Sequence, residues 1–138
     1  MYYIRTCLTT KYACFSGRAR RAEFWTFWFF VQLVNFLFML SILGMNLFYT
    51  GHIFLDFQKL PSSAIILFLV GQLFSVVVLI PFFAVLIRRL HDMNRSGWNM
   101  LLSCIPVVGL IILLIFLCTD TAREANRYGE SPKYPSEE

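Results

Sequence analysis

Charged residues are scarce in this sequence, which sets it apart from soluble proteins. They make up 14% of its 138 residues, whereas soluble globular domains average about 25%. Hydrophobic residues make up 58% of the chain, which includes 15 Phe, and the mean hydropathy is +0.65. So few charges cannot cover the surface of a water-soluble domain of this length. The composition therefore excludes a soluble protein and predicts an integral membrane protein.

The sequence also lacks the cysteine and histidine spacings of metal sites. Its four cysteines, Cys7, Cys14, Cys104 and Cys118, form no C-x-x-C pair and no zinc-ligand spacing with a histidine. We therefore predict no metal, no other cofactor and no disulfide framework. A metal site formed by Cys7, Cys14 and His91 is the alternative.

Recognised catalytic motifs are absent as well. The sequence has no G-x-S-x-G, no H-E-x-x-H and no glycine loop that would cradle a phosphate. His91 and Asp92 are neighbours, but adjacent residues on a helix point about 100° apart, so they do not face each other. We therefore predict that the chain is not an enzyme. The alternative is that His91 acts as a general base oriented by a carboxylate.

Long hydrophobic runs dominate what is present. A helix needs about 20 apolar residues to cross the hydrocarbon core, and three runs meet this length, at about 24–49, 64–87 and 98–118. The sequence predicts an all-α integral membrane protein with three transmembrane helices in a single membrane domain, residues 1–138.

The two ends of the chain are polar. Residues 1–23 form a basic leader, in which apolar residues at helical spacing predict a short amphipathic surface helix. Residues 119–138 form a polar tail. Pro106 and Gly109 lie near the middle of the third run and predict one bent span. The alternative is a re-entrant hairpin, which needs protein cover at that depth.

A polar block from Arg88 to Trp98 separates the second and third runs. Its three arginines lie within eight positions, and each would cost about 2.5–3.5 kcal/mol at the centre of a membrane helix. The block therefore marks a membrane surface. Together with the leader, it predicts a basic face that binds anionic lipid headgroups or an acidic partner segment, and no nucleic acid. The residues expected to bind are Arg18, Arg20, Arg21, Arg88, Arg89 and Arg95.

Other polar residues are expected to have structural roles, namely Glu23, Asn35, Gln72, Ser75, His91 and Asp92. Glu23 begins the first span and the arginines end the second, so an antiparallel hairpin predicts that Glu23 pairs with Arg88 or Arg89. Within the bilayer, Asn35 is expected to hydrogen-bond to Gln72 or Ser75.

An alternative function is a small transporter or channel subunit. Its polar path would lie between the first two spans and be lined by Gln32, Asn35, Gln72 and Ser75. Such paths normally contain ionisable residues, and these two spans have none. The sequence therefore favours a non-enzymatic module that binds membrane lipids and packs with itself or with another membrane protein.

Lys and Arg residues near span ends set orientation by the positive-inside rule. With three spans, the leader and the Arg88–Trp98 block share one side with eight such residues, against four on the other side. This predicts a cytoplasmic N-terminus and block, with the tail outside. The re-entrant hairpin would place the tail inside and change the count to eleven against one.

Three motifs resemble a known family. They are FSGRARRAEFW at residues 15–25, RRLHD with RSGW at residues 88–92 and 95–98, and NRYG at residues 126–129 with Pro132. In this order and spacing they resemble the small bacterial inner-membrane proteins of the YhaH type, which share domain of unknown function 805. The resemblance implies a multi-pass protein of the bacterial inner membrane and no established activity. The family tends to have Gly before its Asn and Pro after its Gly, where this chain has Glu124 and Glu130.

Overall fold

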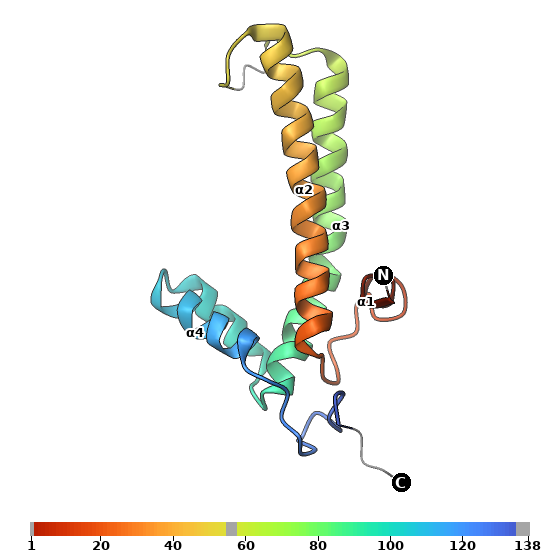
Figure 1. The fold of residues 1–138 in the computed structure, drawn as a ribbon, viewed down its shortest axis with the longest axis vertical. Helices are drawn as coiled ribbons and strands as arrows, with labels where there is room; N and C mark the ends of the chain where they lie inside the picture. The colour runs from red at the N-terminus through yellow and green to blue at the C-terminus, as the bar shows by residue number, and fades with distance from the viewer. Residues whose placement is uncertain (1, 55–57, 135–138) are drawn as a thin grey trace. The chain divides into compact units, whose positions relative to one another are not determined.

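The structure, a computed structural model, describes residues 2–54 and 58–134. Its elements are α1 (Tyr2–Leu8), α2 (Arg21–Thr50), α3 (Ser62–Asp92), the 3-10 helix η1 (Gly97–Cys104) and α4 (Val108–Cys118) (Figure 1). The described residues form no β-strand beyond one isolated bridge in the tail, so the all-α class is confirmed. The chain divides into two compact units, one of Met1–Trp28 with Ile80–Glu138 and one of Phe29–Leu79.

Within the part of the chain that the structure describes, two helices are long and apolar enough to cross a membrane, α2 and α3. They have 30 and 31 residues, and at 1.5 Å per residue each exceeds the roughly 30 Å of hydrocarbon. They contain the predicted spans 24–49 and 64–87. Much of their surface is apolar and exposed, as at Phe36 and Leu69, which suits lipid contact. The helix α3 continues beyond the apolar run to Asp92.

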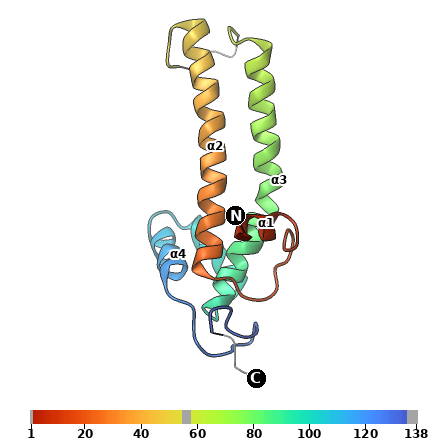
Figure 2. The same ribbon diagram turned by 45° about the vertical axis from the view of Figure 1, so that its right-hand side comes forward.

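In the second unit, α2 and α3 pack along a seam of small residues. On α3, Ala64, Gly71 and Val78 recur every seven residues and are all buried. A Cβ added at Gly71 would lie 3.2 Å from the ring of Phe38 on α2, and the rings of Phe38 and Phe74 are 6.2 Å apart. Figure 2 shows the two segments side by side. Glycine therefore allows the helices to approach closely.

The turn after α2 is held by Asn46, whose side chain is fully buried. Its Nδ2 donates to the carbonyl oxygens of His52 at 2.7 Å and Phe54 at 3.0 Å. One amide thus satisfies two backbone acceptors where the helix ends and the chain reverses.

The third hydrophobic run does not form one helix, so the prediction of a single bent span over 98–118 was wrong. The run forms η1 and α4, which pack against each other, and the chain turns back between them (Figure 1). Ile105 is extended (φ −90°, ψ 108°), because the ring of Pro106 disfavours a helical residue before it. The 11 residues of α4 span only about 16 Å. The hairpin alternative describes this segment.

Gly109 makes the hairpin possible. A Cβ at this position would lie 1.9 Å from the carbonyl oxygen of Leu102 and 2.9 Å from Cβ of Ile105. The backbone of α4 therefore touches the backbone of η1 at a point where no other residue fits. Val107, in the turn, has a positive φ of 63°, which bulky side chains rarely adopt.

We predict that Gly109→Ala destabilises the protein by about 1–3 kcal/mol, because the added methyl group overlaps the backbone of η1. The measurement is thermal unfolding of the full chain in detergent. Gly44→Ala is the matched control. Gly44 lies inside α2 with nothing within 4 Å of an added Cβ, and alanine is the better helix former. Equal melting temperatures for the two variants would contradict the close packing of η1 and α4.

Candidate functional site

A cluster of buried arginines in the first unit connects its distant segments. Arg18 is central to it. Its Nε donates to Oδ1 of Asp92 at 2.9 Å, Nη1 donates to the carbonyls of Glu124 at 2.8 Å and Gly129 at 3.2 Å, and Nη2 donates to the carbonyl of Ala122 at 2.8 Å. One guanidinium, in the leader, thus binds both the end of α3 and the tail.

Arg89 holds the end of α4. Its Nε donates to the carbonyl of Leu117 at 3.3 Å, and its two Nη atoms donate to Thr119 O and to Oδ2 of Asp92. The last carbonyls of a helix have no partner within it and carry negative partial charge, so a cation there is stabilising. Asp92 therefore pairs with Arg18 through one oxygen and with Arg89 through the other.

Glu23 and Arg88 form a second buried ion pair, which confirms that predicted contact. Nη1 of Arg88 lies 2.5 Å from Oε1 of Glu23, and both side chains are buried. The Cys7 thiol on α1 lies 3.8 Å from Oε1 of Glu23. Burial, and next the charge of Glu23, raise the pKa of Cys7 to about 11. Cys7 is therefore a neutral thiol at neutral pH and a poor nucleophile.

His91 packs against the tail. Its ring stacks on Tyr128 with centroids 3.8 Å apart and planes 4° apart, and its Nδ1 lies 3.3 Å from the carbonyl oxygen of Gly17. Asn126 donates through Nδ2 to the carbonyl of His91 at 3.0 Å. The Asp92 carboxylate is engaged with two arginines rather than with His91. Within residues 2–54 and 58–134, no group of three or more His, Cys, Asp or Glu side chains has metal-site geometry.

These contacts correct the predicted location of the tail. Arg18 in the leader donates to carbonyl groups of the tail, and Asn126 in the tail donates to His91 at the end of α3. All of these residues belong to the same compact unit. A tail on the opposite side of the membrane could not reach these groups. The prediction that the leader and the tail lie on opposite sides of the membrane was therefore wrong, because the third hydrophobic run returns instead of crossing.

Three of the six arginines that were expected to bind lipid are buried. Arg18, Arg88 and Arg89 are 6%, 1% and 0% exposed. Arg18 and Arg89 donate to protein oxygens, whereas Arg88 donates to Glu23 and to the Cys7 sulfur, and its buried Nε has no partner among the described residues. All three are enclosed by this chain and cannot reach a headgroup from the surface. Of the predicted residues, Arg20 and Arg21 are partly exposed and Arg95 is exposed, with its guanidinium 5.2 Å from the ring centroid of Phe116.

A small pocket of about 200 Å³ lies at the start of α2 and is lined by Tyr3, Arg20, Arg21, Ala22, Asp120, Thr121 and Lys133. Arg21 lies 3.0 Å and Lys133 2.9 Å from the Asp120 carboxylate. The hydrogen bond from Lys133 holds the pKa of Asp120 below its ordinary value, and the same bond raises the pKa of Lys133. Two cations therefore pair with one carboxylate, and Arg20, which donates to the carbonyl of Pro132, lines the same pocket and gives it an excess of positive charge.

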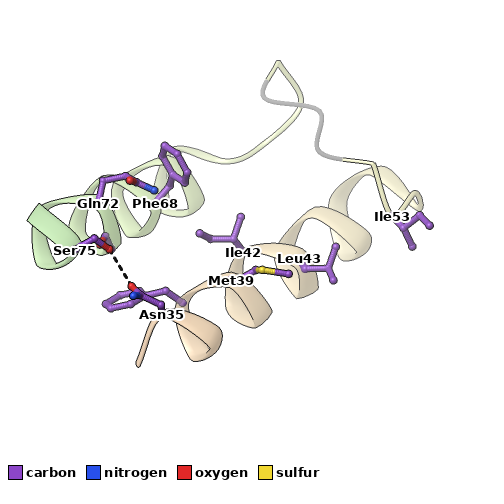
Figure 3. A pocket seen from close by; sticks show the side chains of 10 residues that line it. Asn35, Met39, Ile42, Leu43, Ile53, Phe68, Gln72 and Ser75 are labelled. Carbon is purple, nitrogen blue, oxygen red and sulfur yellow. Dashed lines mark hydrogen bonds between the residues drawn. The ribbon is translucent and has the colours of Figure 1, made fainter. Parts of the chain in front are cut away.

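The second unit contains a larger groove of about 750 Å³ between α2 and α3 (Figure 3). Its lining residues are Asn35, Phe38, Met39, Ile42, Leu43, Ile53, Phe68, Gly71, Gln72 and Ser75. Ser75 donates through Oγ to Oδ1 of Asn35 at 2.9 Å, which confirms the predicted contact with Asn35. The Ser75 hydroxyl is thus paired with the Asn35 carbonyl oxygen, and the rest of the lining is mostly apolar. Gln32 is not among the lining residues. The groove therefore gives little support to a polar transport path.

We predict that Glu23→Gln destabilises the protein by about 3–5 kcal/mol, because it leaves the buried Arg88 charge without its counterion. The measurement is thermal unfolding in detergent. Adding Arg88→Gln to Glu23→Gln should cost little more, since the uncompensated charge is then removed. Asp120→Asn is the control, because Asp120 is exposed and its ion pairs are solvated; it should change the melting temperature little. Strictly additive losses from Glu23→Gln and Arg88→Gln would count against the pair.

Comparison with known proteins shows similarity over nearly the whole chain. The family model described as Protein of unknown function (DUF805) matches residues 12–130. Inner membrane protein YhaI of Escherichia coli strain K12 is 35% identical over 128 residues, covering 91% of this chain and 92% of that protein. Inner membrane protein YhaH of the same strain is 36% identical over 125 residues, covering 89% of this chain and 90% of that protein. No solved structure matches the chain.

Proposed function

Because the chain belongs to the DUF805 family, whose relatives YhaI and YhaH are inner membrane proteins, we propose a role for it at that membrane. It is a multi-pass protein of the bacterial inner membrane with two helices long enough to cross. Its proposed function is non-enzymatic: its basic cytoplasmic face binds the phosphate of anionic lipid headgroups in the pocket formed by Arg20, Arg21 and Lys133.

The excess of positive charge in this pocket carries the proposal. The side chains of Arg21 and Lys133 are 43% and 36% exposed, so their donors are accessible to a ligand. Asp120 neutralises one of the three cations and leaves two. The pocket also adjoins the first residue of α2, where the positive end of the helix dipole favours an anion.

The position of the pocket favours a lipid over an acidic protein segment. It lies at the first turn of a membrane-spanning helix, where the headgroups begin. Trp25 and Trp28 follow within two turns, with ring centroids 5.6 Å apart, and indoles prefer this interface. Exposed apolar residues of the η1–α4 hairpin, such as Val107 and Val108, suit insertion into the same leaflet. A lipid can therefore contact the cations through its phosphate while its chains remain in hydrocarbon.

The charge distribution supports a cytoplasmic location for this face. With the tail on the side of the leader, eleven Lys and Arg residues lie on one side of the two spans, and Lys59 alone lies on the other. Orientation follows such asymmetry, and the cytoplasmic leaflet attracts basic segments at about 1 kcal/mol per residue.

We predict that Asn94 and Ala125 are inside and Ser63 is outside. Single cysteines at these positions, in a chain with Cys14, Cys104 and Cys118 replaced by alanine, would be exposed to a membrane-impermeant thiol reagent in intact cells. Position 63 should label, and positions 94 and 125 should label only after the cells are opened. The native Cys7, which is buried, stays in every variant, and its labelling gives the background signal. Labelling of 125 in intact cells would contradict the return of the tail, and labelling of 94 would reverse the orientation.

We predict that removal of two pocket charges weakens anionic lipid binding by roughly one order of magnitude. The purified full chain, in neutral detergent, would be titrated with phosphatidylglycerol or phosphatidylcholine and the bound lipid counted by native mass spectrometry. Phosphatidylglycerol should bind preferentially, and Arg20→Gln with Lys133→Gln should remove that preference.

The matched control is Arg123→Gln with Arg127→Gln, which removes two exposed tail charges that do not line the pocket. It should retain the preference for phosphatidylglycerol. Equal losses in the two double variants would mean that net charge alone attracts the lipid and would contradict a defined site. Competition by inorganic phosphate, without any effect of the lipid, would point to a soluble anion instead.

A further inference from the structure

We propose that the protein forms a two-fold symmetric dimer in the membrane through the face of α3 that carries Gln72. The observation behind this proposal is an exposed glutamine inside a membrane-spanning helix. Gln72 lies about 15 Å along α3 from Ser62 and is exposed. Among the described residues its amide has no hydrogen-bond partner, in contrast to Ser75, which is bonded to Asn35.

An unpaired amide at this depth is unfavourable in lipid. Hydrocarbon offers no donor or acceptor, so a polar side chain there is stabilised by a partner on another helix. Figure 3 shows Gln72 and Ser75 on α3 along one side of the groove, with only Ser75 joined to α2. The partner that Gln72 lacks must therefore come from outside the described chain.

The residues around Gln72 have the spacing of a helix-packing seam. Ile65, Leu69, Gln72, Val76 and Leu79 follow each other at alternating steps of four and three, which is a heptad pattern. All five are exposed. The inner seam of α3, at Ala64, Gly71 and Val78, is buried and meets α2 at Gly71. Gln72 lies at the edge of the groove beside α2, but the other four seam residues do not line that groove, so they form a second face that remains available.

The chemistry of glutamine selects a second copy of this chain as the occupant. Its amide contains both donors and an acceptor, so it complements another glutamine. All copies have the same orientation in the membrane, and a two-fold axis along the membrane normal therefore brings Gln72 of one copy to the depth of Gln72 of the other. Two reciprocal hydrogen bonds then satisfy both amides, with the apolar seam residues packed on either side.

The first test is disulfide crosslinking in inner-membrane vesicles. Val76→Cys, on the proposed face one turn after Gln72, should crosslink two copies of the full chain upon mild oxidation. Val70→Cys is the matched control, because Val70 is also an exposed valine of α3 but points about 120° away from Val76 on the helix. Crosslinking at 70 and not at 76, or crosslinking at 76 only to other proteins, would overturn the proposal.

The second test measures the dimer dissociation constant by sedimentation equilibrium in neutral detergent. Gln72→Leu should raise it roughly threefold to tenfold, and Gln72→Asn, which keeps an amide, should recover part of the loss. Ser41→Leu is the control for removing an exposed polar side chain from a membrane helix, because the Ser41 hydroxyl donates to the carbonyl of Leu37 in its own helix at 2.8 Å, and it should leave the dissociation constant unchanged. A monomer at every concentration, or equal effects of Gln72→Leu and Ser41→Leu, would overturn the proposal.

Discussion

Buried positive charge is the constraint on which the first unit depends. Three guanidinium groups, of Arg18, Arg88 and Arg89, lie out of contact with solvent, and each would be costly without partners. Among the described residues, the acids buried with them are Glu23 and Asp92. Carbonyl oxygens of the tail and of the end of α4 provide further acceptors for Arg18 and Arg89. The folding of the tail is therefore tied to the charges at the end of α3.

This constraint explains why the chain returns after α4. The hairpin of η1 and α4 brings the last carbonyls of a helix to Arg89 and leads the tail to Arg18. A third membrane crossing would have separated these groups by the thickness of the bilayer. The exposed arginines of the same region lack such enclosure. Position, and not residue type, thus divides the basic residues into those that hold the fold and those available for a ligand.

The sequence could predict the features that follow from the order and spacing of residue types along the chain. Hydropathy located α2 and α3, and the register of an antiparallel hairpin predicted Glu23 beside Arg88 or Arg89 and Asn35 beside Gln72 or Ser75. The third run could not be assigned in this way, because its hydropathy suits either a crossing or a hairpin. Whether this run crosses or turns back depends on the backbone contact at Gly109, and this contact exists only once η1 and α4 have folded. Likewise, backbone carbonyls have no sequence signature, so the partners of Arg18 could not be predicted.

The polar residues of the second unit also need hydrogen-bond partners, but they are uncharged, so leaving one unpaired costs less free energy than leaving a buried arginine unpaired. Oγ of Ser75 on α3 donates to Oδ1 of Asn35 on α2, so this pair fixes the register of the two helices. Gln72, three residues before Ser75, is exposed and has no such bond within the described residues. Satisfied polar pairs stabilise one packing of two helices, whereas an unsatisfied one favours the addition of another helix. The distinction required the structure, because Gln72 and Ser75 were equivalent candidates for Asn35 by sequence spacing.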